Sequence, residues 1–360
     1  MNKPLDVTIV ILDNGFTSTA IGPMEVFYSA GRLLQMLLGA PEQPRFNVRM
    51  ASIDGKPVTS SYGIALIPHC GIDDVTQTDL VLITASHSCL LEKFTANTAI
   101  VQWLLNAHEK GSYLAGVCSG VAVIAETGLL DGRRATTHWG VADSYRQRYP
   151  KVRWQPEHFI TEDGGLFCGG GVYSAIDLSL YLVEKFCGHE IALECAKSLI
   201  VTPPRNLQSG YAVAPLSRPH GDERIKQIED QLQNSFSQNI SIEAVASEHA
   251  MSSRNLHRRF KAATGLLPGE YIQLLRISAA RQILERGRAP VQKVASAVGY
   301  DDSTYFRSLF KRHTGMTPSE YRNRFGPLVI NSGRPAEKKD SHRGKQAPML
   351  EASAASLLQH

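Results

Sequence analysis

A tandem repeat near the C-terminal end constrains the fold of this chain most. Residues 242–271 and 291–321 carry two versions of one pattern, IEAVASEHAMSSRNLHRRFKAATGLLPGEY and VQKVASAVGYDDSTYFRSLFKRHTGMTPSEY. The offset between the copies is 49 residues at first and 50 from Phe260 onward, so the second copy has gained one residue near Asp301 and Asp302. Such a repeat indicates a duplicated supersecondary unit and excludes one enzyme fold over the whole chain.

Basic charge is concentrated in the repeat. Residues 241–326 hold 14 Lys and Arg against 7 Asp and Glu, a balance of +7, whereas the rest of the chain holds 24 against 27. The length of 360 residues and the average hydrophobic and charged fractions predict two ordinary globular domains. The repeat therefore carries the surface that would neutralise phosphates.

Each copy predicts two helices joined by a tight turn. In the first copy Ser241 is a candidate N-cap for a helix over 242–248, and Ser252 begins a second helix that ends near Ala263. Between the copies, 270–286 reads as a helix of about 25 Å, comparable to the roughly 34 Å between major-groove entries on one face of DNA. We expect the outward residues of the second helices to contact DNA, namely Ser253, Arg254, His257, Arg258, Lys261, Ser303, Thr304, Arg307, Ser308 and Lys311. The alternative is that these basic residues only solvate the surface of an all-helical domain.

A family resemblance favours DNA binding. The segment ARQILERGRAPVQKVASAVGYDDSTYFRSLFKRHTGMTPSEYR closely resembles the AraC/XylS transcription-factor domain, and the resemblance extends over about 100 residues. It implies two helix-turn-helix motifs on a scaffold of seven helices, and binding to promoter DNA.

The first 200 residues alternate apolar strands with helical stretches. The continuous apolar run DLVLIT is typical of a strand buried on both faces, so a parallel sheet with helical cover is expected. The expected strands are 7–12, 47–52, 80–84 and 113–117, and the expected helices are 22–38, 98–110, 119–126 and 174–186.

Cys118 lies between an expected strand and an expected helix, in the segment LAGVCSGVAV. Gly116, Ser119 and Gly120 permit the sharp turn that exposes a nucleophile, with a helix N-terminus behind it. Such a site is expected to lower the pKa of the thiol and to stabilise an oxyanion, and His138 could approach the sulfur. The alternatives are a small buried hydrophobic cysteine and a core histidine.

This segment resembles the PfpI-like branch of the class I glutamine-amidotransferase superfamily over roughly residues 5–195. The resemblance implies a flavodoxin-like sandwich with Cys118 and His138 at its elbow. Thr19 stands where relatives place Asp or Glu, and a hydroxyl carries no charge to act as a general base. We therefore expect a non-catalytic domain that binds a ligand through Thr19, Cys118, Ser119, His138 and Trp139. Further matches to the family pattern are Gly22, Pro23, Glu25, Val26, Phe27 and Asp177.

The order of the two domains resembles that of GlxA-like transcriptional regulators. We expect an α/β flavodoxin-like sensor domain with a mostly parallel sheet over 1–200, a linker over 201–221, an all-α DNA-binding domain with two helix-turn-helix motifs over 222–326 and a disordered tail over 327–360. The expected function is that of a transcriptional activator controlled by a small metabolite, with nitrogenous metabolites as a candidate class. The alternatives are an active cysteine hydrolase or hydratase, or a Cys118 redox sensor, fused to a DNA-binding domain.

The expected partners are promoter DNA, a small-molecule effector, RNA polymerase and a second copy of the chain. The N-terminus MNKPLDVTIVILDNG is expected to form a first strand rather than a signal peptide, and no segment has the roughly 18 apolar residues of a membrane helix. A cytoplasmic protein with reduced cysteines is expected. The six cysteines show no paired metal spacing, and neither a metal nor a cofactor is expected.

Overall fold

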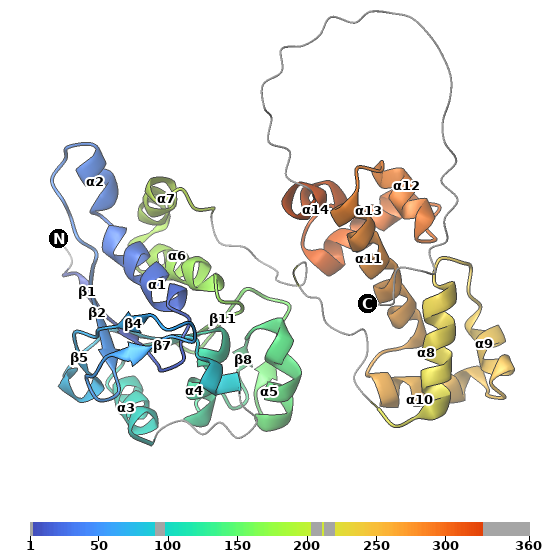
Figure 1. Ribbon diagram of the computed structural model, residues 1–360, viewed down its shortest axis with the longest axis horizontal. Coiled ribbons are helices and arrows are strands. Elements are labelled where there is room, and N and C mark those ends of the chain that lie inside the picture. Colours follow the sequence, from blue (N-terminus) through green and yellow to red (C-terminus); the bar gives the residue numbers. More distant parts are fainter. Residues whose placement is uncertain (1–2, 91–97, 203–210, 212–219, 327–360) are drawn as a thin grey trace, which may run out of the picture. The chain divides into compact units, whose positions relative to one another are not determined.

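The computed structural model describes residues 3–90, 98–202, 211 and 220–326. It contains two compact units, Met1–Ala214 and Pro215–His360, the first built from a sheet with helices and the second from helices (Figure 1). The predicted fold class, an α/β domain with a mostly parallel sheet followed by an all-α domain, is confirmed. Most of the predicted linker and all of the predicted tail lie outside the described residues.

A seven-stranded sheet forms the centre of the first unit, in the order β10-β11-β7-β6-β1-β2-β5. Every neighbouring pair is parallel except β10 with β11, which are antiparallel at one edge. All residues of β6 are buried, because helices cover both faces of the sheet. The strand bounds are β1 Leu5–Val10, β2 Phe46–Ser52, β5 Cys70–Gly71, β6 Leu80–Ile83, β7 Tyr113–Val117, β10 Ile160–Asp163 and β11 Leu166–Gly169. Two small sheets pair β3 Val58–Thr59 with β4 Ala65–Leu66, and β8 Arg134–Ala135 with β9 Arg153–Trp154.

Two hydrophobic clusters join the helices to the two faces of the sheet. On one face Ile9 of β1 packs with Phe27 and Leu178 of the covering helices, and on the other Ile83 of β6 packs with Ile124. The first face is covered by α1 Ser18–Ser29, α6 Ser174–Cys187 and α7 His189–Ser198 (Figure 1). The second is covered by α3 Thr98–Glu109, α4 Val121–Glu126 and α5 Ala142–Arg148.

The helix expected over 22–38 is two helices, and this part of the prediction is wrong. α1 ends at Ser29, and a second short helix, α2, spans Leu33–Leu37. Gly31 between them has a φ of +75°, and a Cβ there would lie 2.0 Å from the carbonyl oxygen of Gln43. The chain turns at this glycine because no other residue type fits the conformation and the close approach.

The second unit is helical throughout its described regular structure, and its helices repeat in the order of the sequence repeat (Figure 1). The turn before the second helix of the pair runs over 249–252 in the first copy and over 298–302 in the second, which confirms the one-residue gain. The helix bounds are α8 Glu223–Ser235, α9 Ile242–Glu248, α10 Ser253–Thr264, α11 Pro268–Arg286, α12 Val291–Ala297, α13 Ser303–Thr314 and α14 Pro318–Phe325. None of the helices in the described ranges has the length and apolar content needed to cross a bilayer.

Candidate nucleic-acid interface and cysteine elbow

Helices α10 and α13, the second helices of the two copies, begin and end in the same way. Ser252 caps α10 by accepting a hydrogen bond from Asn255 N at 3.3 Å, and Asp302 caps α13 by accepting one from Thr304 N at 2.7 Å. Each helix ends at a glycine with positive φ, Gly265 at +82° and Gly315 at +75°. These caps fix both helix lengths at 12 residues.

The inner faces of the two helices are also equivalent. Phe260 stacks edge-on against Tyr271 with ring centroids 5.3 Å apart, and Phe310 does the same against Tyr321 at 5.4 Å. All four side chains are buried. The repeated sequence thus forms the same hydrophobic interior twice, which orients both helices alike within their motifs.

All ten predicted DNA contacts lie on α10 and α13. Arg254, Arg258 and Lys261 of α10 and Thr304, Arg307, Ser308 and Lys311 of α13 are exposed, whereas Ser253, His257 and Ser303 are half-buried. The ring of His257 donates from Nδ1 to Ser253 O at 2.7 Å, which leaves Nε2 as its other polar atom. Tyr305, which is 51% exposed beside Thr304 on α13, was not among the predicted contacts. The sequence signal for Tyr305 is its place three residues before Ser308, since residues three apart lie on the same side of a helix.

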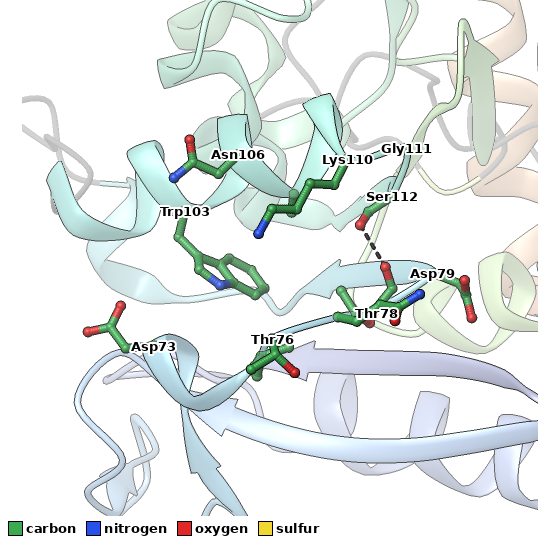
Figure 2. Close-up of a pocket in the computed structure, with 12 residues that line it drawn as sticks. Asp73, Thr76, Thr78, Asp79, Trp103, Asn106, Lys110, Gly111 and Ser112 are labelled. Carbon is green, nitrogen blue, oxygen red and sulfur yellow. Dashed lines mark hydrogen bonds between the residues drawn. The ribbon is translucent and has the colours of Figure 1, made fainter.

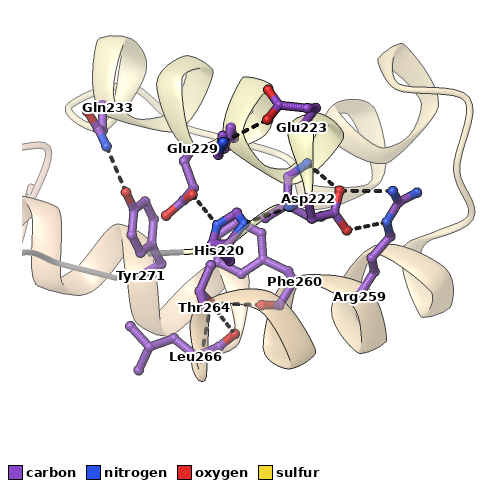
Figure 3. Close-up of polar contacts among 12 residues, drawn as sticks. His220, Asp222, Glu223, Glu229, Gln233, Arg259, Phe260, Thr264, Leu266 and Tyr271 are labelled. Carbon is purple, nitrogen blue, oxygen red and sulfur yellow. Dashed lines mark hydrogen bonds and ion pairs between the residues drawn. The ribbon is translucent and has the colours of Figure 1, made fainter. Parts of the chain in front are cut away.

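One basic residue of α10 serves the fold instead. Arg259 binds both carboxylate oxygens of Asp222, with Nε to Oδ2 at 2.5 Å and Nη2 to Oδ1 at 2.9 Å (Figure 3). The arginine hydrogen bonds hold the pKa of Asp222 below its usual range. Asp222 also caps α8 by accepting from Ile225 N, and the preceding His220 pairs with the buried Glu229 at 2.8 Å. The first described residues of the second unit are thereby joined to α10.

The chain makes the expected sharp turn after β7. Cys118 has a φ of +54°, the left-handed conformation that residues other than glycine rarely adopt. Close packing behind the turn requires glycine at position 120, since a Cβ there would lie 2.4 Å from Thr84 O. A strained residue between a strand and a helix is the geometry of a nucleophile elbow.

Hydrogen bonds hold this elbow from three directions. The Ser119 hydroxyl donates to Ser86 O at 2.8 Å and accepts from Ser86 N at 3.0 Å. The Thr137 hydroxyl donates to Cys118 O at 2.9 Å, and the Tyr145 hydroxyl donates to Ser119 O at 3.2 Å. The elbow is therefore a rigid part of the domain.

The Thr19 hydroxyl and Nδ1 of His138 are also hydrogen-bonded within the protein. The hydroxyl of the fully buried Thr19 donates to Phe16 O at 2.7 Å and accepts from Ala85 N at 3.1 Å. His138 accepts from Gly140 N through Nδ1 at 3.0 Å, and burial lowers the pKa of its ring. Within the described part of the chain, no hydrogen bond joins Cys118 to either residue.

Each of the two units matches the model of a known protein family. Residues 8–185 match the model of the DJ-1/PfpI family, and residues 245–324 match the model of a helix-turn-helix domain. The isonitrile hydratase of Pseudomonas putida is 30% identical over 170 residues, which are 46% of this chain and 71% of that protein. The chain belongs to the DJ-1/PfpI family.

The DJ-1/PfpI domain is followed by an AraC-type helix-turn-helix domain, the combination found in a group of HTH-type transcriptional regulators. The regulator CdhR of Pseudomonas aeruginosa is 27% identical over 298 residues, 82% of this chain and 87% of CdhR. The regulator GlxA of Rhizobium meliloti is 26% identical over 219 residues, 60% of this chain and 67% of GlxA. The predicted GlxA-like architecture is confirmed.

The DJ-1/PfpI elbow of this chain disfavours a thiolate. Burial raises the pKa of Cys118 to about 11, and the hydrogen bonds from Ser119 offset this only in part. The expectation of a lowered pKa is wrong because the side chain is only 5% exposed, and loss of water outweighs the favourable dipoles of the turn. The neutral hydroxyl of Thr19 adds no base.

A cavity of about 400 Å³ lies elsewhere in the DJ-1/PfpI domain, beside the amino ends of β6 and β7 (Figure 2). Trp103 of α3 and Lys110, just after the end of α3, line one side of it, and Asp73 and Thr76 line the other. The elbow lies at the opposite, carboxyl end of β7, so this cavity contains none of the predicted ligand-binding residues. In the described part of the chain, no group of three His, Cys, Asp or Glu side chains is arranged to hold a metal ion.

Proposed function

We propose that this protein is a sequence-specific DNA-binding transcriptional regulator, with α10 and α13 as recognition helices. The observation that carries the proposal is the equivalence of the two motifs, each of which buries its apolar face and exposes basic side chains, joined on α13 by exposed hydroxyl groups. A helix of this kind fits the major groove, where Arg binds guanine and Ser or Thr contacts several base edges. The alternative, basic residues that only solvate the surface, does not account for polar residues at matching positions on both helices.

Selection of bound duplexes from a random-sequence pool, followed by footprinting, tests the proposal. We expect one site that extends over two major-groove entries, and a loss of specific affinity with Arg258→Ala and with Arg307→Ala. Arg224→Ala is the matched control, because Arg224 is exposed on α8 outside the recognition helices. Recovery of no common sequence, or equal losses in all three variants, would contradict the proposal.

We propose that the DJ-1/PfpI domain regulates this activity by binding a small metabolite, without catalysis. One support is the raised pKa of Cys118, which keeps its thiol protonated. The other is Thr19, which supplies no base and whose hydroxyl is hydrogen-bonded to backbone groups. Regulation requires the metabolite to bind one state of the protein better than another. CdhR and GlxA are named as regulators, which supports a regulatory DJ-1/PfpI domain here as well.

The class of effector, activation through RNA polymerase and assembly as a homodimer belong to the same proposal. A thermal-shift screen of the full chain against amines, amino acids and their catabolites tests the effector class, since a specific ligand raises the unfolding temperature with its concentration. Transcription from the selected site in a purified system, with and without a stabilising compound, distinguishes activation from repression. Sedimentation of the same samples gives the number of chains.

An active cysteine hydratase is the second candidate, because the strained elbow is intact and an isonitrile hydratase is similar over the same domain. Hydration of a simple isonitrile by the full chain tests it. Turnover that disappears with Cys118→Ala while DNA binding persists would establish the enzyme. Equal background rates for both proteins would reject it.

A further inference from the structure

One arginine links the two helix-turn-helix motifs through three backbone carbonyls. Arg276 lies near the middle of α11, the long helix that connects the motifs. Its Nε donates to Phe236 O at 2.7 Å and its Nη2 to Gln238 O at 2.8 Å, both in the connection between α8 and α9. Its Nη1 donates to Gly299 O at 2.9 Å, in the turn between α12 and α13.

The two connected segments also touch directly. Gly299 has a φ of +85°, and a Cβ there would lie 2.4 Å from Ser237 O. The turn of the second motif therefore packs against the first motif with no room for a side chain. This contact and the three hydrogen bonds brace the motifs at a second place besides α11 itself.

The same arginine reaches the second recognition helix through an aromatic ring. Its guanidinium lies over the ring of Tyr300, 5.0 Å from the centroid, and Tyr300 is buried. Tyr300 in turn packs against Phe306 of α13 at 5.7 Å. The orientation of α13 is thus tied to the α8–α9 connection, and not only to its own motif.

We propose that Arg276 sets the angle and the distance between the two recognition helices, so that the protein accepts a single spacing between its two half-sites. The inference rests on the proposed DNA-binding function. It adds Arg276 to that function as a positioning residue, one that is not proposed to contact DNA itself. One inserted base pair rotates the second half-site by about a tenth of a DNA turn and moves it along the axis. Two motifs held together by Arg276 cannot change their relative orientation to match the altered half-sites. Two motifs joined by α11 alone can.

The test uses the full chain and the DNA site recovered by random-pool selection, together with the same site carrying one or two inserted base pairs between the half-sites. For the unaltered protein we expect each insertion to reduce affinity at least about tenfold, comparable to the loss of one base contact. Arg276→Gln and Arg276→Lys should bind the original site more weakly and lose most of this discrimination, with an affinity ratio between original and altered sites near one. Lysine keeps the charge but cannot bond to three carbonyls at once.

Two matched controls separate positioning from general damage. Arg281→Gln removes another half-buried arginine of α11, one that bonds to Tyr321 on the α14 side, and should keep the spacing discrimination. Gly299→Ala forces the two segments apart and should relax it. Gly265→Ala has the same left-handed strain with open space around the new methyl group, and should not.

The outcomes distinguish this inference from the function on which it rests. If the unaltered protein selects no DNA sequence, the proposed function fails and the inference fails with it. If it selects a site but tolerates the insertions, or if the Arg276 variants discriminate spacing as the unaltered protein does, the DNA-binding function stands and the role of Arg276 is overturned. Circular dichroism of each variant identifies any that fails to fold. If the Arg276 variants do not fold, the spacing discrimination of Gly299→Ala decides whether the contact between the two motifs sets the half-site spacing.

Discussion

Asp222 and Arg259 form a two-point ion pair that joins the residue before α8 to helix α10. Asp222→Asn keeps a side-chain oxygen for the cap of α8 but removes the charge, so we expect a loss of up to about 1 kcal/mol for this partly exposed pair. Asp222→Ala also removes the cap and should cost roughly 0.5–2 kcal/mol more. Hydrogen exchange of the α8 and α10 amides measures both losses.

The ion pair also predicts a dependence on pH. The folded state lowers the pKa of Asp222, so its contribution to stability is complete above the unfolded value near 4 and disappears as pH falls through the folded value. The difference between the unaltered protein and Asp222→Asn should therefore vanish in acid. Lys226→Gln, which breaks the exposed pair with Glu223, is the control and should change little at any pH. A difference that persists well below pH 4 would show that Asp222 acts through something other than its charge.

Arg307 and Lys311 of α13 should respond differently to alanine substitution. We expect Arg307→Ala to cost about 1–3 kcal/mol of binding free energy at the selected site and to relax the preference for one base. Lys311→Ala should weaken binding to all sequences alike and reduce the slope of log affinity against log salt by about one. Titrations of specific and scrambled duplexes at several salt concentrations measure both effects, and identical behaviour of the two variants would exclude this division of roles.

Cys118 should react slowly with alkylating reagents at neutral pH. Its pKa of about 11 leaves a thiolate fraction roughly a hundredfold below that of an ordinary cysteine, and its rate should rise as pH increases toward 11. Labelling with iodoacetamide, resolved by peptide mass spectrometry, gives the rate, and the urea-unfolded chain gives the reference. Labelling in the native protein as fast as in the unfolded chain would revive the redox-sensor hypothesis.

The repeat made the second unit predictable from sequence. The helix over 242–248 has its predicted bounds, because Ser241 caps it and its apolar residues recur with helical spacing. The helix expected from 270 begins at Pro268, two residues earlier, because proline at the first position needs no N–H partner. Local signals were sufficient wherever residues near in sequence determine the structure.

Contacts between distant residues were not predictable in this way. The pairing of Asp222 with Arg259 and the three carbonyl partners of Arg276 depend on how helices pack, and no spacing in the sequence encodes them. The pKa of Cys118 was predicted with the wrong sign for the same reason. The turn and helix N-terminus are local, whereas the burial that dominates comes from the surrounding domain.

Substitutions of Thr19 measure how much its two backbone hydrogen bonds stabilise the DJ-1/PfpI domain. Thr19→Val preserves the shape but leaves Ala85 N and Phe16 O without their partner, so we expect a loss of about 1–3 kcal/mol in the free energy of unfolding. Thr19→Ser keeps the hydroxyl and should lose only about 1 kcal/mol for the missing methyl group. Tryptophan fluorescence during urea unfolding reports this unit, because Trp103, Trp139 and Trp154 all lie in it.

The rate of Cys118 alkylation in the same variants separates a structural Thr19 from a functional one. Because the Thr19 hydroxyl bonds to the backbone and not to the thiol, Thr19→Val should leave the native labelling rate unchanged once differences in stability are accounted for. Thr59→Val, at an exposed position of β3, should change neither quantity. A labelling rate that changes severalfold in Thr19→Val alone would mean that Thr19 acts on the thiol, and would strengthen the case for a catalytic elbow.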